Sequence, residues 1–200
     1  MAPLVILIGG LSRSGKSTMV RLVADGLRRK GVEVLTIPLD HWIVPLEIRK
    51  PNSTVLERYR LGDASRDLQL ILSGVEVVVT PYDPVSRGLG DANVTFAINR
   101  FTQALLIEGV TALAHTRFLE LADYCVYVEA KRFTRLRRLV EFYRHTKRMP
   151  FCEYRQLIRA REREETPSIT ATRTLADLVV TEENSEFLQE RINTLIERRL

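Results

Sequence analysis

The sequence predicts a three-layer α/β fold built on a mostly parallel sheet. Short runs of Val, Ile and Leu alternate along the chain with longer stretches whose apolar residues recur at helical spacing. The apolar runs are continuous, which is typical of strands covered on both faces, and strands separated by helices form parallel βαβ units. With 200 residues, 45% of them hydrophobic, the chain can bury one substantial core, so we expect a single domain over residues 1–200.

Each expected strand is a short apolar, β-rich run, and each expected helix is a longer amphipathic stretch. The strands are expected at residues 4–8, 32–37, 75–79, 105–107, 124–128 and 178–180. The helices are expected at residues 17–30, 63–72, 116–122, 133–148, 152–165 and 185–199. The apolar stripe of the last helix either packs onto the sheet or forms a dimer contact, so a homo-oligomer remains open.

Basic charge is concentrated in one segment. The chain has 30 Lys and Arg against 25 Asp and Glu, and residues 131–173 alone hold 13 Lys and Arg against 5 Glu. The segment therefore carries a formal charge of +8, whereas the rest of the chain is slightly acidic. Such a block indicates an anionic partner, or else a solvated helical face supported by pairs such as Arg137 with Glu141.

Two kinds of sequence pattern are missing: membrane-spanning or signal segments, and cysteine spacings typical of metal or redox sites. No apolar run reaches the roughly 18–20 residues that span a bilayer, and the apolar opening has no basic segment before it, so we expect a cytoplasmic protein with no membrane partner. Cys125 and Cys152 share no metal-ligand or redox spacing with each other or with the three histidines, so neither is assigned a role.

Ligands of open parallel sheets bind at the carboxyl ends of the strands, so the residues that follow each apolar run are the candidates for function. The first run is followed by the sequence GLSRSGKS, a complete P-loop (Walker A) pattern between an expected strand and an expected helix. Its glycines let successive backbone N–H groups converge on a phosphate at the N-terminus of a helix. The alternative is a glycine-rich turn without a ligand.

This pattern predicts a P-loop NTPase fold that binds ATP with Mg²⁺. Lys16 is expected to reach the β- and γ-phosphates, and the Ser17 hydroxyl to bind the metal. The expected nucleotide-binding residues are Gly10, Ser12, Arg13, Ser14, Gly15, Lys16, Ser17 and Thr18.

Carboxylates follow two further apolar runs. Asp40 comes after the second one, where it is suited to orient or deprotonate an acceptor hydroxyl, to bind Mg²⁺, or simply to cap a turn. Glu108 comes after the run at 105–107, in the Walker B arrangement that places a carboxylate near the metal. His41 and Trp42 are expected to be packing residues.

The basic segment is expected to form a lid over the nucleotide at about residues 131–166. Phosphoryl transfer is catalysed largely by positioning and by cations around the transferred group. Arg135 and Arg138 lie on the first of the two basic helices, where they are placed to screen that charge when a lid closes. An RNA-binding surface would also be basic, but no nucleic-acid-binding motif is present, so we do not expect a nucleic-acid partner.

With these motifs in order, the chain resembles the uridine kinase/phosphoribulokinase family of P-loop small-molecule kinases. The likeness runs from about residue 4 to residue 180. It rests on the P-loop, on LDHW at 39–42, on YDPVSR at 82–87, on LIEGV at 106–110, on the Arg-rich helix and on LADLVV at 175–180.

The resemblance implies transfer of the γ-phosphate of ATP to a hydroxyl of a nucleoside, uridine or cytidine, or of a related sugar-like acceptor. It implies that Asp40 is the general base, that Ser17 and Glu108 lie near Mg²⁺ together with Asp40, that Asp63 binds ribose hydroxyls and that Tyr82 lines the acceptor pocket.

The chain departs from uridine–cytidine kinases in the loop after Tyr82. Those enzymes continue with a Phe and a base-contacting His, where this chain has Pro84 and Arg87. A cation in place of a neutral donor indicates a more anionic acceptor, so Arg87 is a candidate substrate-binding residue. The alternatives are a kinase for another acceptor (pantothenate, glycerate, a nicotinamide riboside or a phosphosugar) and a nucleotide-binding switch or pseudo-kinase without phosphotransfer.

Overall fold

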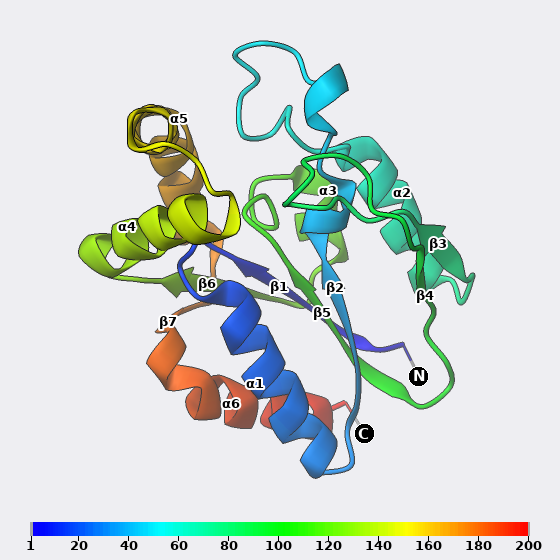
Figure 1. Cartoon of the computed structure of the whole chain (residues 1–200). Helices are drawn as coiled ribbons and strands as arrows, with labels where there is room; N and C mark the ends of the chain where they lie inside the picture. Colours follow the sequence, from blue (N-terminus) through cyan, green and yellow to red (C-terminus); the bar gives the residue numbers. More distant parts are fainter. Residues whose placement is uncertain (1, 200) are drawn as a thin grey trace.

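The computed structural model describes residues 2–199 and contains a five-stranded sheet in which all strands are parallel (Figure 1). The strand order is β2-β5-β1-β6-β7. The strands are β1 (Leu4–Gly9), β2 (Glu33–Pro38), β5 (Thr102–Glu108), β6 (Tyr124–Glu129) and β7 (Leu178–Thr181). All five were expected from the apolar runs, because each is covered on both faces and can be apolar throughout.

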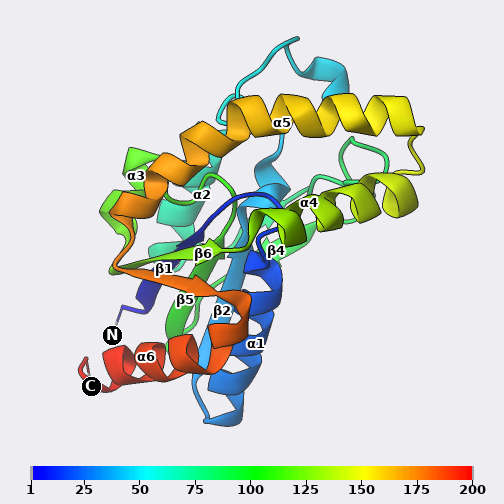
Figure 2. The ribbon, with the colours of Figure 1, turned by 90° about the vertical axis from the view of Figure 1, so that its left-hand side faces the viewer.

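Helices cover both faces of the sheet and confirm the three-layer α/β fold (Figures 1 and 2). One face packs on α1 (Lys16–Arg29) and α6 (Ser185–Glu197), whose apolar stripe closes the core. The other face packs on α2 (Leu61–Leu72) and α3 (Thr116–Leu121). No helix in the described part of the chain is long and apolar enough to cross a membrane.

One expected strand lies outside the parallel sheet. The run at 75–79 forms β3 (Val77–Val79), which pairs antiparallel with β4 (Val94–Phe96) in a separate two-stranded sheet. The prediction that it belongs to the main sheet was therefore wrong. Val77 and Val79 are buried whereas Val78 is 56% exposed, so this strand is covered on one face only. A run of three valines hides that alternation, because every position is apolar.

Above the sheet, α4 (Arg132–Glu141) and α5 (Phe151–Ala171) form a helical hairpin from the basic segment (Figure 2). The first helix is shorter than expected, because it passes into a π-helical turn at Phe142–Thr146. The second is longer than expected and continues through Pro167. Its last turns bury Ile169 completely in the core, and this packing offsets the hydrogen bond that a proline cannot donate.

Two aspartates set the register between neighbouring strands. Asp123 precedes β6, where its backbone N–H donates to the Val5 carbonyl (2.9 Å) and its Oδ2 accepts the Val5 N–H (2.8 Å). Asp177 precedes β7 and repeats the arrangement with Cys125, at 2.9 Å and 2.7 Å. Each aspartate follows a Leu-Ala pair, so the repeated LAD tripeptide is a strand-pairing device.

We expect Asp177→Ala to lower the free energy of unfolding by about 1–2 kcal/mol, because the Cys125 N–H loses a charge-assisted partner at the start of β6. Urea unfolding followed by circular dichroism measures this change. Asp25→Ala, which removes only an exposed pair with Arg28, is the control and should change stability by less than about 0.5 kcal/mol. Equal effects of the two substitutions would contradict the register role.

Candidate active site

The P-loop joins β1 to α1 as a turn in which several residues have positive φ. Gly10 has φ 139° and Gly15 has φ 101°, and both conformations disfavour side chains. At Gly10 a Cβ would lie 2.4 Å from the Val128 carbonyl oxygen, so only glycine fits between β1 and β6. The loop thereby turns sharply enough to present its N–H groups at the N-terminus of α1, an arrangement suited to binding phosphate.

Lys16, Ser17 and Glu108 meet at the base of this loop. The Ser17 hydroxyl donates to Glu108 Oε1 at 2.7 Å. Lys16 is buried, and its Nζ donates to the Leu11 carbonyl at 2.9 Å. Burial lowers the pKa of Lys16, an effect opposed by Glu108 and Asp40, and burial raises the pKa of Glu108. The Glu108 carboxylate thus lies near the Lys16 ammonium group and accepts a hydrogen bond from the Ser17 hydroxyl.

The Ser17–Glu108 pair fits Mg²⁺. A hydroxyl and a carboxylate oxygen are hard donors, and Mg²⁺ in nucleotide sites takes only one or two protein ligands and completes its shell with phosphate oxygens and water. The two oxygens are close enough to enter one coordination shell. Ser17 and Glu108 would hold the ion, with the phosphates supplying other ligands.

Asp40 lies in a 3-10 turn, Leu39–Trp42, directly after β2. A Cβ on Gly109 would lie 2.8 Å from Leu39 Cβ, so the glycine after Glu108 lets this turn pack against the end of β5. The Asp40 carboxylate is exposed to the cavity, and its Oδ1 accepts a hydrogen bond from the Tyr59 hydroxyl at 3.1 Å. Burial and the nearby Asp40 raise the pKa of Tyr59, so this hydroxyl keeps its proton.

The packing roles expected for His41 and Trp42 are confirmed. Trp42 is buried, and its indole Nε1 donates to Asp67 Oδ2 at 2.8 Å. The His41 ring lies 5.6 Å from that of Phe96, and burial lowers the pKa of the imidazole.

These groups surround a cavity of about 1160 Å³ at the carboxyl ends of the strands. Most of the residues predicted from the sequence line it: Ser12, Arg13, Gly15, Lys16, Ser17, Thr18, Asp40, Tyr82, Arg87, Glu108 and Arg138. Gly10 and Ser14 belong to the P-loop but do not line the cavity: Ser14 is buried, and its hydroxyl lies next to Gly10.

Besides Gly10 and Ser14, two further predicted residues, Arg135 and Asp63, do not line the cavity. Arg135 is only 2% exposed; its Nη2 pairs with Glu162 and lies 3.5 Å from the Thr166 hydroxyl, so it joins α4 to α5. Asp63 lies in the first turn of α2 and pairs with Arg66 at 3.4 Å. The expected contact of Arg135 with a transferred phosphate, and of Asp63 with ribose hydroxyls, finds no support in this arrangement.

Arg161 and Glu165 of α5 were missed by the sequence analysis, although they line the cavity and bind the P-loop directly. Glu165 Oε1 accepts the Ser12 N–H at 2.8 Å, and Arg161 Nη1 donates to the Ser12 hydroxyl at 2.8 Å. Arg161 and Glu165 also pair with each other at 3.4 Å. Burial alone would lower the pKa of Arg161, but Glu165 and its other neighbours raise it. The i,i+4 spacing of these two residues predicts only an ion pair along one helix, and it does not predict their contact with the P-loop.

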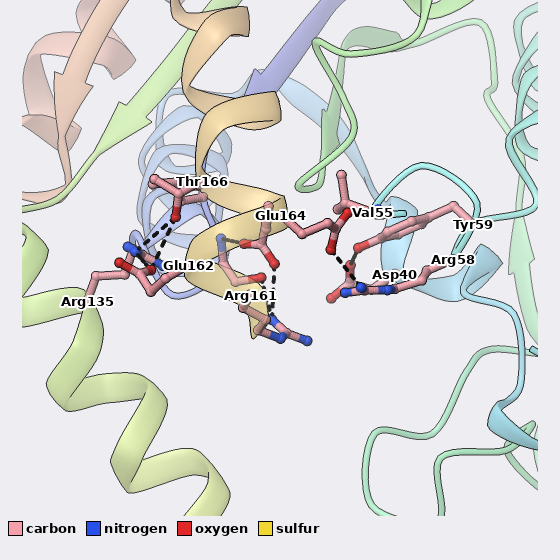
Figure 3. Close-up of polar contacts among 12 residues, drawn as sticks. Asp40, Val55, Arg58, Tyr59, Arg135, Arg161, Glu162, Glu164 and Thr166 are labelled. Atoms are coloured by element: carbon pink, nitrogen blue, oxygen red, sulfur yellow. Dashed lines mark hydrogen bonds and ion pairs between the residues drawn. The ribbon is translucent and has the colours of Figure 1, made fainter. Parts of the chain in front are cut away.

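The neighbouring carboxylates of α5 point to opposite sides of the helix (Figure 3). Glu162 reaches Arg135 of α4. Glu164 accepts the Val55 N–H and pairs with Arg58 at 2.6 Å. One helix thus holds α4, the P-loop and the segment at residues 53–58 together, and it closes the cavity from above.

No protein-family model and no curated protein sequence matches the chain. Solved structures do match. A candidate uridine kinase from Bacillus stearothermophilus aligns with a TM-score of 0.60 at 20% identity, covering 90% of this chain and 89% of that one. A candidate fructose transport system kinase from a Silicibacter species aligns with a TM-score of 0.69 at 17% identity, covering 89% of each chain.

The phosphoribulokinase of Rhodobacter spheroides aligns with a TM-score of 0.63 at 16% identity, covering 90% of this chain and 71% of that one. At these identities the likeness shows the fold, which is the one that P-loop kinases adopt.

The Glu165 carboxylate accepts a backbone N–H of the P-loop, so a phosphate bound by that loop would have to compete with it. We expect Glu165→Gln to tighten ADP binding roughly 3- to 10-fold, because the substitution removes a negative charge beside Ser12 and releases Arg161. Isothermal titration calorimetry with Mg·ADP measures the change.

Glu153→Gln is the matched control, since it removes an exposed carboxylate from the first turn of the same helix. Its ADP affinity should equal that of the wild type. Unchanged or weaker binding by Glu165→Gln would show that the carboxylate does not compete with phosphate.

Proposed function

We propose that this protein is an ATP- and Mg²⁺-dependent kinase that transfers the γ-phosphate to a hydroxyl group of a small nucleoside- or sugar-like acceptor. The observation that carries the proposal is the shared cavity: Asp40 faces the same space as Lys16 and the Ser17–Glu108 pair. A purely structural capping aspartate would not need to face a phosphate-binding loop. The fold shared with solved P-loop kinases supports this assignment.

In the proposed reaction, the acceptor hydroxyl oxygen attacks the γ-phosphorus. A new oxygen–phosphorus bond forms, the bond from the γ-phosphorus to the bridging oxygen breaks, and ADP leaves with that electron pair. Asp40 takes the hydroxyl proton. Tyr59 donates to Oδ1 of Asp40 and so leaves Oδ2 to accept that proton.

The phosphates are held by the P-loop amides and by Lys16. Mg²⁺ held by Ser17 and Glu108 would neutralise phosphate charge as the bond breaks. Arg13, Arg138 and Arg161 line the same cavity, where they are suited to stabilise charge on the transferred group. Arg138 Nη1 lies 3.5 Å from the Arg13 carbonyl oxygen, and Arg13 stacks on Phe142 with its guanidinium carbon 3.7 Å from the ring centre.

The α4–α5 hairpin is the lid in this proposal. Its contacts to the P-loop run through Arg161 and Glu165, which are the groups that an arriving phosphate would displace or recruit. Closing the hairpin over the nucleotide would exclude water and reduce hydrolysis of ATP.

We expect Asp40→Asn to lower the rate of acceptor-dependent ADP release from Mg·ATP by about 10²–10⁴-fold, because the amide cannot accept the hydroxyl proton. ADP affinity should stay within about threefold of the wild type, since among the described residues the Asp40 carboxylate accepts its hydrogen bond from Tyr59 and none from a P-loop N–H group. A coupled ADP-release assay over a panel of hydroxylated acceptors, each against an acceptor-free blank, measures the rate.

Asp25→Asn, on the exposed side of α1, is the control and should retain full activity. Full activity of Asp40→Asn would rule out its role as the base. A wild-type protein that binds ATP but responds to no acceptor would instead favour a nucleotide-binding switch.

A further inference from the structure

The cavity extends well beyond the phosphate-binding loop, and its far wall is cationic. Among the described residues, the cavity is lined by more basic than acidic side chains, eight Lys and Arg against five Asp and Glu. Arg13, Lys16, Arg138 and Arg161 belong to the phosphate end, as described above. Arg58 is paired with Glu164. Arg49, Arg87 and Lys147 remain, and the proposed transfer of phosphate does not use them.

A series of backbone contacts connects the segment after Asp40 to this far wall. Next to Asp40, Ile43 forms an antiparallel bridge with Tyr59, and the Val44 N–H then donates to the Arg58 carbonyl at 2.9 Å. Further along, the Leu46 N–H donates to the Arg87 carbonyl at 2.9 Å. Arg87 therefore belongs to the wall that begins at the proposed base, and not to the phosphate-binding loop. A ligand group at this wall would lie on the Asp40 side of the cavity.

Arg87 is presented by a tightly structured loop between β3 and β4, which reaches toward the carboxyl ends of β2 and β5 (Figure 1). Asp83 organises this loop: its two carboxylate oxygens accept the N–H groups of Val85 and Ser86, both at 2.8 Å. The Ser86 side chain and these two backbone N–H groups lower the pKa of Asp83 to about 2, so the carboxylate stays charged within the loop. The Arg87 N–H donates to the Asp83 carbonyl, and Arg87 has φ 63°.

The guanidinium of Arg49 lies on the adjoining segment. The Arg49 backbone N–H donates to the carbonyl of Leu46, whose own backbone N–H donates to the Arg87 carbonyl. The Arg49 Nη2 donates to the Val44 carbonyl at 2.5 Å, whereas the Arg49 Nε is buried and has no hydrogen-bond partner among residues 2–199. A buried donor without a partner costs free energy, and an acceptor atom of a ligand would relieve that cost.

Lys147 approaches from the lid, just after the π-helical turn. Burial and the nearby Arg87 lower the pKa of this lysine, and Asp83 opposes that effect. Within the described part of the chain, no carboxylate lies within ion-pair distance of Arg87 or Lys147. Arg87 and Lys147 are thus two like charges near each other, with Asp83 as a nearby carboxylate that pairs directly with neither among the described residues.

We propose that the acceptor carries an oxyanion, a carboxylate or a phosphate group, that Arg49, Arg87 and Lys147 bind at the far wall of the cavity. The proposal rests on the proposed kinase function and narrows its substrate class to anionic hydroxy compounds such as sugar phosphates or sugar acids. An arginine binds either oxyanion through two parallel N–H donors, which also fixes the orientation of the acceptor hydroxyl toward Asp40. Lys147 adds its charge when the lid closes.

The first experiment compares neutral acceptors with their anionic derivatives. Glycerol and glycerate, glucose and gluconate, ribose and ribose 5-phosphate, and fructose and fructose 6-phosphate are each tested for stimulation of ADP release from Mg·ATP by the full chain. We expect only the anionic members to stimulate ADP release. Because two of the pairs contain a carboxylate and two contain a phosphate, the comparison also shows which of these anions is preferred. Equal stimulation by the neutral members would overturn the inference while leaving the kinase function intact.

The second experiment measures Arg87→Gln with the best anionic acceptor. Loss of a charge-assisted bidentate contact should raise the KM for that acceptor about 10- to 100-fold, while the KM for ATP changes less than about threefold. Arg87→Lys keeps the charge but loses the bidentate guanidinium contact, so its KM for the acceptor should lie between that of Arg87→Gln and that of the wild type. Arg29→Gln, at the exposed end of α1, is the matched control and should behave as the wild type.

The outcomes separate the two proposals. An unchanged acceptor KM in Arg87→Gln contradicts the anion site. Should Arg87→Gln lose ADP binding through misfolding, Arg49→Gln tests the same wall with the same expected rise in KM. If no acceptor stimulates ADP release by the wild-type protein, the kinase function itself fails, and the inference fails with it.

Discussion

The alignment of three strand ends is the constraint on which the site depends. In the parallel register, Ile8 of β1 and Pro38 of β2 both lie opposite Glu108 of β5. The P-loop leaves from the first of these ends and the Asp40 turn from the second, so the P-loop, the Ser17–Glu108 pair and the Asp40 carboxylate must meet. A shift of one residue in β5 would turn Glu108 toward the opposite face of the sheet and dissolve the Ser17–Glu108 pair.

The long helix α5 provides a second level of organisation. Within one and a half turns it places Arg161 and Glu165 on the P-loop, Glu162 on α4 and Glu164 on the segment near Arg58. Ion pairs of this kind contribute little stability when exposed, but here they are partly buried and connect separate parts of the chain. In the proposed function, the same contacts that keep the hairpin over the cavity occupy groups that a phosphate would otherwise bind, which would couple ligand binding to the position of the hairpin.

Much of the fold and part of the site were predictable, because they depend on local patterns. The P-loop, Asp40 and Glu108 follow continuous apolar runs, and such runs form strands buried on both faces wherever they occur. The strand at 75–79 was misplaced because three consecutive valines carry no alternation to distinguish a half-covered hairpin from a central strand. Arg135 and Arg138 are equally basic and three residues apart, yet the packing of α5 buries the first against Glu162 and leaves the second on the cavity.

The sequence by itself determined the class of the fold, the phosphate-binding loop and the carboxylates beside it, since each depends on residues within a few positions of one another. Only the tertiary structure decided which distant charges share a space. Glu165 meets Ser12 across 153 positions, and Arg87 is linked to Arg49 through two backbone hydrogen bonds at Leu46. Such partners carry no local signal, because their proximity follows from helix packing and loop conformation and from no spacing along the chain.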